Sequence, residues 1–116
     1  MRSTVLALAT LLVASAPALA DGVYRGASSV AGGRDPACAG VTSMTAIVSG
    51  SSIRLDGAVY EGAGAPGTGT VKSDGSFTAV KETAKGNVAF TGRVTANNVV
   101  AQWKGPDCYG AIDLAK

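Results

Sequence analysis

The segment Gly86–Lys104, GNVAFTGRVTANNVVAQWK, constrains the fold most strongly, because apolar and polar residues alternate along both of its arms. An alternation of period two places successive side chains on opposite faces of a β-strand. Asn97 and Asn98 stand between the arms and favour a two-residue turn that pairs Ala96 with Val99. The segment therefore predicts a β-hairpin with one apolar face, which is half of an antiparallel core.

The first twenty residues carry the pattern of a secretory signal peptide. Arg2 supplies a positive charge, Val5–Ala16 is apolar, and an Ala-Leu-Ala signal ends at Ala20. This pattern predicts a signal peptide over residues 1–20, with cleavage between Ala20 and Asp21. The apolar run is too short to cross a bilayer comfortably as a helix.

The remaining residues, 21–116, are expected to form one domain, since their number suits a single hydrophobic core. Export predicts a periplasmic or secreted location, and no membrane span is expected in the mature chain. Sixteen glycines and few large side chains predict a thin core that would benefit from a covalent cross-link.

The mature chain is expected to be all-β, with about eight strands and no helix. Alternation and turn residues place these strands at 22–26, 41–48, 53–60, 67–72, 76–81, 86–96, 99–104 and 108–114. A turn after Ser49 pairs Val48 with Ile53, and a loop with a left-handed Gly75 pairs Val71 with Phe77. Residues 28–40 and 61–66 are expected to be loops.

Cys38 and Cys108 are expected to form a disulfide, because the count is even and export leads to an oxidising compartment. In a flat sheet the first and eighth strands would lie about 34 Å apart. A disulfide joins Cα atoms only about 4.4–6.8 Å apart. The bridge therefore predicts a small up-and-down barrel closed by one disulfide, with a β-sandwich as the alternative.

The connections between strands predict two unlike ends of the barrel. The second, fourth and sixth connections are tight turns, whereas the first, third, fifth and seventh are longer or richer in Gly and Pro. Loops on a rigid scaffold are the usual place for binding residues. We call the end with the longer connections the long-loop end. Its candidate rim residues are Arg34, Asp35, Glu61, Glu82, Lys104 and Asp107.

The predicted inner face carries five large side chains of the mature chain. These are Tyr24, Met44, Phe77, Phe90 and Trp103. They could line a site for a small apolar ligand, or they could simply fill the interior, since an eight-stranded barrel is narrow enough for side chains to do so. The pattern leaves both possibilities open.

Charge and residue types exclude several function classes. Ten basic and eight acidic side chains are scattered, which indicates no nucleic-acid footprint. No His is present, which excludes Ser-His and Cys-His nucleophiles and leaves too few ligands for zinc. Lys81 is expected in a solvated turn. We expect a protein that is not an enzyme and has no cofactor and no metal.

The residues Gly-Val-Tyr-Arg-Gly at 22–26, followed by a meander of eight strands with a late Trp103, resemble the avidin and lipocalin (calycin) class of barrels. The chain is also similar to small secreted bacterial metalloprotease inhibitors, which are compact barrels with one disulfide. These resemblances imply, respectively, a ligand held at one end of a barrel and a protease bound by it.

Two functions from different classes follow from these expectations. The first is a non-catalytic binding module whose long-loop end holds a small apolar ligand or an envelope or secreted protein, with inhibition of a secreted protease as one form. The second is a structural, envelope-associated protein with a filled core and no ligand.

Overall fold

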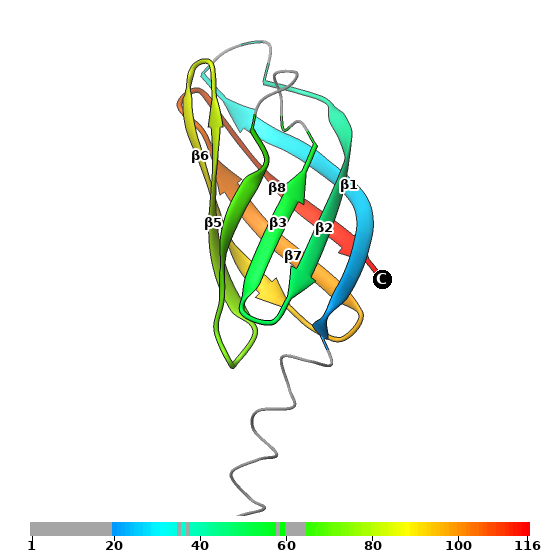
Figure 1. Cartoon of the computed structure of the whole chain (residues 1–116). Helices are drawn as coiled ribbons and strands as arrows, with labels where there is room; N and C mark the ends of the chain where they lie inside the picture. The colour runs from blue at the N-terminus through cyan, green and yellow to red at the C-terminus, as the bar shows by residue number, and fades with distance from the viewer. Residues whose placement is uncertain (1–19, 35, 37, 58, 60–64) are drawn as a thin grey trace, which may run out of the picture.

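The protein is a closed antiparallel barrel in which eight strands pair in sequence order and β8 returns beside β1 (Figure 1). The computed structural model describes residues 20–34, 36, 38–57, 59 and 65–116. The strands are β1 (Gly22–Gly33), β2 (Val41–Ser49), β3 (Ser52–Asp56), β4 (Gly67–Val71), β5 (Ser76–Thr83), β6 (Gly86–Val94), β7 (Asn98–Lys104) and β8 (Cys108–Ala115).

The alternation in sequence becomes an alternation of burial. Along β7, Val99, Ala101 and Trp103 are buried in the barrel, whereas the residues between them are exposed. The same rule holds in β8, where residues 108, 110, 112 and 114 are buried. One face of every strand thus supplies the core, as the period of two predicts.

The disulfide joins Cys38 to Cys108, with their Cα atoms 5.4 Å apart. Beside it, β1 pairs with β8 from Arg25 to Gly33, which closes the sheet on itself. The prediction of a barrel is confirmed, and the sandwich alternative is wrong. A disulfide is compatible with an oxidising compartment.

The first strand is longer than predicted, because residues 28–33 extend β1 instead of belonging to a loop. Closure of a barrel staggers its strands, so one strand must pair with its two neighbours over different stretches. The early part of β1 pairs with β2 up to Ser29, and its later part pairs with β8 up to Gly33. A bulge between Val30 and Gly32 accommodates this change.

The register of the β6–β7 hairpin differs from the prediction by two residues. Val94 pairs with Val99, so the turn is centred on Ala96 and Asn97. The hydroxyl of Thr95 accepts hydrogen bonds from the backbone N–H groups of Asn97 and Asn98, at 3.3 and 3.0 Å. This local bonding selects the turn, and because the shift is even, every side chain keeps its predicted face.

The other two hairpins have their predicted registers. Val48 pairs with Ile53, and Val71 pairs with Phe77. Gly75 has a φ of 91°, as its predicted left-handed conformation requires. The strand predicted over 53–60 is shorter, because β3 ends at Asp56.

The barrel has two unlike ends. One end, at the bottom of Figure 1, carries the β2–β3, β4–β5 and β6–β7 turns, and we call it the tight end. The β1–β2, β3–β4, β5–β6 and β7–β8 connections join their strands at the opposite, long-loop end. The third of these is a two-residue turn, shorter than predicted, because β5 continues to Thr83.

Among the residues that the structure describes, no helix is long and apolar enough to span a membrane. Residues 1–19, which hold nearly all of the predicted signal peptide, lie outside the described residues.

Candidate functional site

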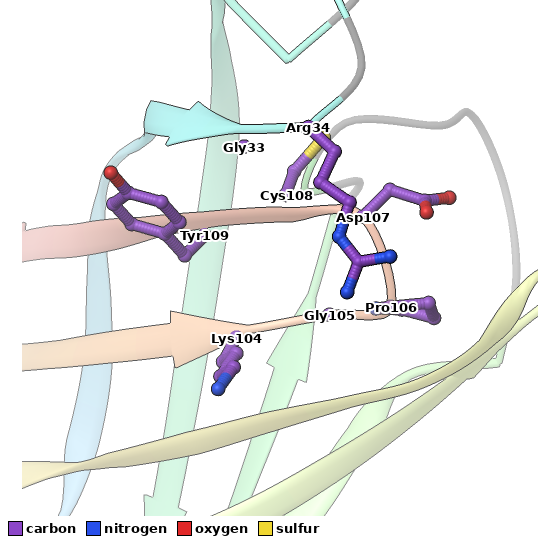
Figure 2. Close-up of a pocket in the computed structure, with 8 residues that line it drawn as sticks. All are labelled: Gly33, Arg34, Lys104, Gly105, Pro106, Asp107, Cys108 and Tyr109. Carbon is purple, nitrogen blue, oxygen red and sulfur yellow. The ribbon is translucent and has the colours of Figure 1, made fainter.

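A pocket of about 390 Å³ opens at the long-loop end, beside the disulfide. Figure 2 shows the end of β1 on one side of it and the β7–β8 turn on the other. We call it the rim pocket. The residues that line it are Gly33, Arg34, Lys104, Gly105, Pro106, Asp107, Cys108 and Tyr109.

Backbone hydrogen bonds and the disulfide hold the two sides of the rim pocket together. The N–H of Arg34 donates to the carbonyl oxygen of Asp107 at 3.0 Å, and the N–H of Gly105 donates to that of Cys108 at 2.8 Å. The Cys38–Cys108 bridge links the loop after β1 to the start of β8. The pocket is therefore organised before any ligand arrives, which reduces the entropy lost on binding.

Gly33 allows this close approach. Its φ is 156°, and a Cβ atom there would lie 2.2 Å from the carbonyl oxygen of Asp107 and 2.5 Å from Sγ of Cys38. No side chain fits in that space, so the disulfide packs directly against the backbone of β1.

The rim pocket carries two cationic side chains, Arg34 and Lys104, and both are exposed. Neither forms an ion pair with a carboxylate of the described residues. In Figure 2 the carboxylate of Asp107 points away from the guanidinium of Arg34. The two cations are thus available to a carboxylate or phosphate on a partner.

Tyr109 adds an exposed aromatic surface beside the cations. Its side chain is 51% exposed although it lies at the start of β8. Its ring packs over Gly32, where a Cβ atom would lie only 2.7 Å from the phenol oxygen. Large, stiff aromatic side chains of this kind are enriched in protein interfaces.

The rim pocket continues down the outer wall of the barrel. Lys104 and Tyr109 also border a shallow depression of about 760 Å³ on the outer face of β6, β7 and β8. Small side chains, Ala31, Ala89 and Ala111, form part of its lining. A further depression of about 580 Å³ shares Thr91, Gln102 and Ala111 with it. We call this continuous surface the β6–β8 wall.

The structure brings only some of the candidate rim residues together. Arg34, Lys104 and Asp107 line the rim pocket. Glu82 is exposed on β5, pairs with Asn87 of β6, and is not part of the pocket. Asp35 and Glu61 lie outside the described residues.

The five large residues of the predicted inner face all lie inside the barrel. Tyr24, Met44, Phe77, Phe90 and Trp103 are at most 2% exposed. Trp103 pairs with Gly110, and a Cβ atom at that glycine would lie 2.6 Å from the indole ring. Large side chains packed against glycines in this way fill a narrow barrel.

Sequence reasoning missed both polar residues that are buried in the described interior. Ser28, expected in the loop over residues 28–40, lies on β1 and is 0% exposed. Lys81 was expected in a solvated turn, but it faces the core of β5 and is 2% exposed. The alternation along β5 carries the signal, since Phe77, Ala79 and Lys81 share one face. The charge of Lys81 nevertheless predicted an exposed position, because lysines are rarely buried.

The acidic residues and cysteines of the described ranges form no group of three or more that could hold a metal ion. Comparisons of the chain with protein-family models, with curated proteins and with solved structures find no significant match.

Proposed function

We propose that this protein is a non-catalytic binding module that recognises a partner protein through the rim pocket and the adjoining β6–β8 wall. The proposal rests on one observation. In the rim pocket, which the disulfide holds together, two cations, Arg34 and Lys104, lie beside the half-exposed ring of Tyr109. Cationic and aromatic side chains on a rigid support are typical of interface anchors.

We further propose that the chain is exported, that residues 1–20 are removed, and that the partner is a periplasmic or secreted protein. The disulfide supports this location, because such bridges persist in oxidising compartments. The absence of His from the sequence excludes Ser-His and Cys-His nucleophiles, which supports a non-catalytic role.

A partner protein is favoured over a small apolar ligand because of the interior. An apolar ligand inside the barrel would need the space that Phe77, Phe90 and Trp103 occupy. The open depressions instead lie on the outside and at the rim, where a protein surface can reach them.

The test is affinity capture of extracytoplasmic proteins on residues 21–116, with three forms of the domain compared by quantitative mass spectrometry. Besides the unchanged domain, the forms are the rim variant Arg34→Ala/Lys104→Ala and the control Arg54→Ala/Lys72→Ala. The control removes the same charge from exposed positions away from the rim pocket.

We expect at least one protein that the unchanged domain and the control retain and the rim variant loses. If every retained protein binds the three forms equally, the rim pocket is not the binding site. A small-ligand function would instead appear as apolar compounds that raise the melting temperature and change Trp103 fluorescence.

A further inference from the structure

The rim pocket and the larger depression of the β6–β8 wall share two exposed residues, Lys104 and Tyr109. These residues pair with each other across β7 and β8. On one side of the pair lies the β7–β8 turn, with Arg34 bound to the carbonyl oxygen of Asp107. On the other side, two residues further along each strand, lie Gln102 and Ala111. A single segment of a partner can therefore occupy both hollows by crossing over the Lys104–Tyr109 pair.

The rim pocket is the cationic end of this surface. The exposed side chain of Arg34 reaches from the end of β1 over the start of β8 toward Gly105 (Figure 2). Arg34 and Lys104 form no ion pair with a carboxylate of the described residues, and the carboxylate of Asp107 points away from the guanidinium. A guanidinium can bind a carboxylate through two parallel hydrogen bonds. The rim pocket therefore favours an acidic side chain.

The larger depression of the wall has a different character. It has a volume of about 760 Å³, and its lining includes three alanines and the ring of Tyr109. At the far end of the wall, Arg93 and Asp113 border the adjoining depression and carry opposite charges. The net positive charge of this surface therefore lies at the rim, and the depression suits an apolar side chain.

The spacing of the two hollows matches an extended peptide. Gln102 is two residues before Lys104, and Ala111 is two residues after Tyr109. In an extended chain, side chains two residues apart point to the same side and stand about 7 Å apart. A segment that lies along the strands thus directs alternate side chains into the rim pocket and the depression. The exposed amide of Gln102 can donate to, and accept from, the backbone of that segment.

We propose that the partner presents an extended segment with an acidic and an apolar side chain two residues apart. The carboxylate enters the rim pocket and pairs with Arg34, and the apolar side chain enters the larger depression of the β6–β8 wall. This inference rests on the function proposed above and names the chemistry of the partner. A peptide is favoured over an anionic polymer, because such a polymer would meet Asp107 in the pocket and an apolar surface beyond it.

The test is an NMR titration of ¹⁵N-labelled residues 21–116 with the disulfide intact. The probes are the blocked heptapeptide Gly-Ser-Phe-Ser-Asp-Ser-Gly and the peptide with Phe and Asp exchanged, since the segment can run in either direction. In one control peptide Asn replaces Asp, and in another Ala replaces Phe. A third control has the same composition but places Phe and Asp next to each other, so that they point to opposite sides.

We expect one of the two probes to shift the amide signals of Arg34, Tyr109 and Ala111. Replacement of Asp by Asn should weaken its binding about fivefold or more, and replacement of Phe by Ala about tenfold. The control with adjacent Phe and Asp should bind about fivefold more weakly than the probe. No shift with either probe, or equal affinities for the Asp and Asn peptides, overturns the inference.

Variants of the protein assign the two hollows. Arg34→Gln should abolish the preference for Asp over Asn, whereas Arg25→Gln, on the outer face of β1 and away from both hollows, should keep it. Ala111→Gln should weaken the Asp and Asn peptides equally, and the exposed Ala115→Gln should weaken neither. A preference for Asp that survives in Arg34→Gln overturns the inference.

Acidic residues outside the described ranges are tested in the same way. Asp35 and Glu61 belong to connections at the long-loop end. Peptide binding that occurs only in Asp35→Asn or Glu61→Gln would show that the chain supplies its own acid to Arg34, and it overturns the inference.

The inference and the proposed function can fail separately. If affinity capture yields a protein that the rim variant loses but neither probe binds, the function stands and the inference is wrong. If a heparin tetrasaccharide shifts the signals of Arg34 and Tyr109 and the peptides do not, the site binds a sulfated glycan and the inference is wrong. Asp-dependent peptide binding without a captured protein supports the inference and counts against the proposed partner.

Discussion

The phenol of Tyr24 donates a hydrogen bond of 2.9 Å to the carbonyl oxygen of Thr95 and so links β1 to the β6–β7 turn across the tight end. The same hydroxyl lies against the carbonyl oxygen of Ala20. The ammonium of Lys116 stands 5.5 Å from the centre of the Tyr24 ring. One wholly buried side chain thus joins three separate segments at this end of the barrel.

Tyr24→Phe removes the hydroxyl but keeps the ring, so it isolates this link. We expect the free energy of unfolding to fall by about 1 kcal/mol, the usual net value of one hydrogen bond. Urea denaturation of residues 21–116 measures the change. Tyr109→Phe is the matched control, because that side chain is half exposed, and its stability should change by less than about 0.5 kcal/mol. Equal effects of the two substitutions would show that the Tyr24 link contributes nothing specific.

Tyr24 also predicts a dependence of stability on alkaline pH. Burial, and then the charge of Asp21, raise the pKa of the Tyr24 phenol above its ordinary value near 10. A group with a raised pKa in the folded state contributes stability that is fully present below its unfolded pKa and is lost as pH rises through its folded pKa.

The stability difference between the unchanged protein and Tyr24→Phe should therefore be constant up to about pH 10 and shrink above it. Urea denaturation of both proteins at pH 8 and at pH 11 measures that difference. A difference that grows with pH would contradict the assigned direction.

Much of the fold could be predicted because local patterns and one covalent constraint agree. The alternation in β6 to β8 assigns inward and outward faces, and Cys38 and Cys108 require β8 to return beside β1. The length of β1 could not be read locally. Residues 28–33 are small and rich in Gly and Ser, and they form a strand because β8 supplies hydrogen-bond partners that lie far away in sequence.

The candidate site was predicted only in part, for a similar reason. Arg34, Lys104 and Asp107 belong to connections that meet at the disulfide, so topology brings them together. Glu82 stands at the same end but on β5, away from that meeting point. The partly buried hydrogen bond from Lys81 to the carbonyl oxygen of Ala65 joins residues 16 positions apart, which no local pattern encodes.

Removal of the disulfide in Cys38→Ala/Cys108→Ala should destabilise the barrel strongly. The bridge closes a loop of 70 residues, for which the chain-entropy model gives roughly 4 kcal/mol. Guanidinium denaturation with and without dithiothreitol measures the loss. Reductant should lower the stability of the unchanged protein to that of the double variant and should have no effect on the variant itself. If reduction leaves the unchanged protein at full stability, the bridge is not what holds β1 and β8 together.

Gly33→Ala should disturb the rim pocket through a steric effect that a second glycine can separate from backbone strain. Gly33 and Gly40 have φ values of 156° and 117°, but a Cβ atom at Gly40 would have nothing within 4 Å. Backbone strain of about 1–3 kcal/mol is expected at each position. Only Gly33→Ala also forces apart the carbonyl oxygen of Asp107 and the disulfide.

We therefore expect Gly33→Ala to lower the free energy of unfolding by at least about 1 kcal/mol more than Gly40→Ala does. Urea denaturation of the two variants measures this difference. Amide hydrogen exchange at Arg34, whose N–H donates to Asp107, should be faster in Gly33→Ala and unchanged in Gly40→Ala. Equal stability and equal exchange in the two variants would mean that the rim pocket can relax around an added methyl group. The close packing of Cys38 against β1 would then not set the shape of the pocket.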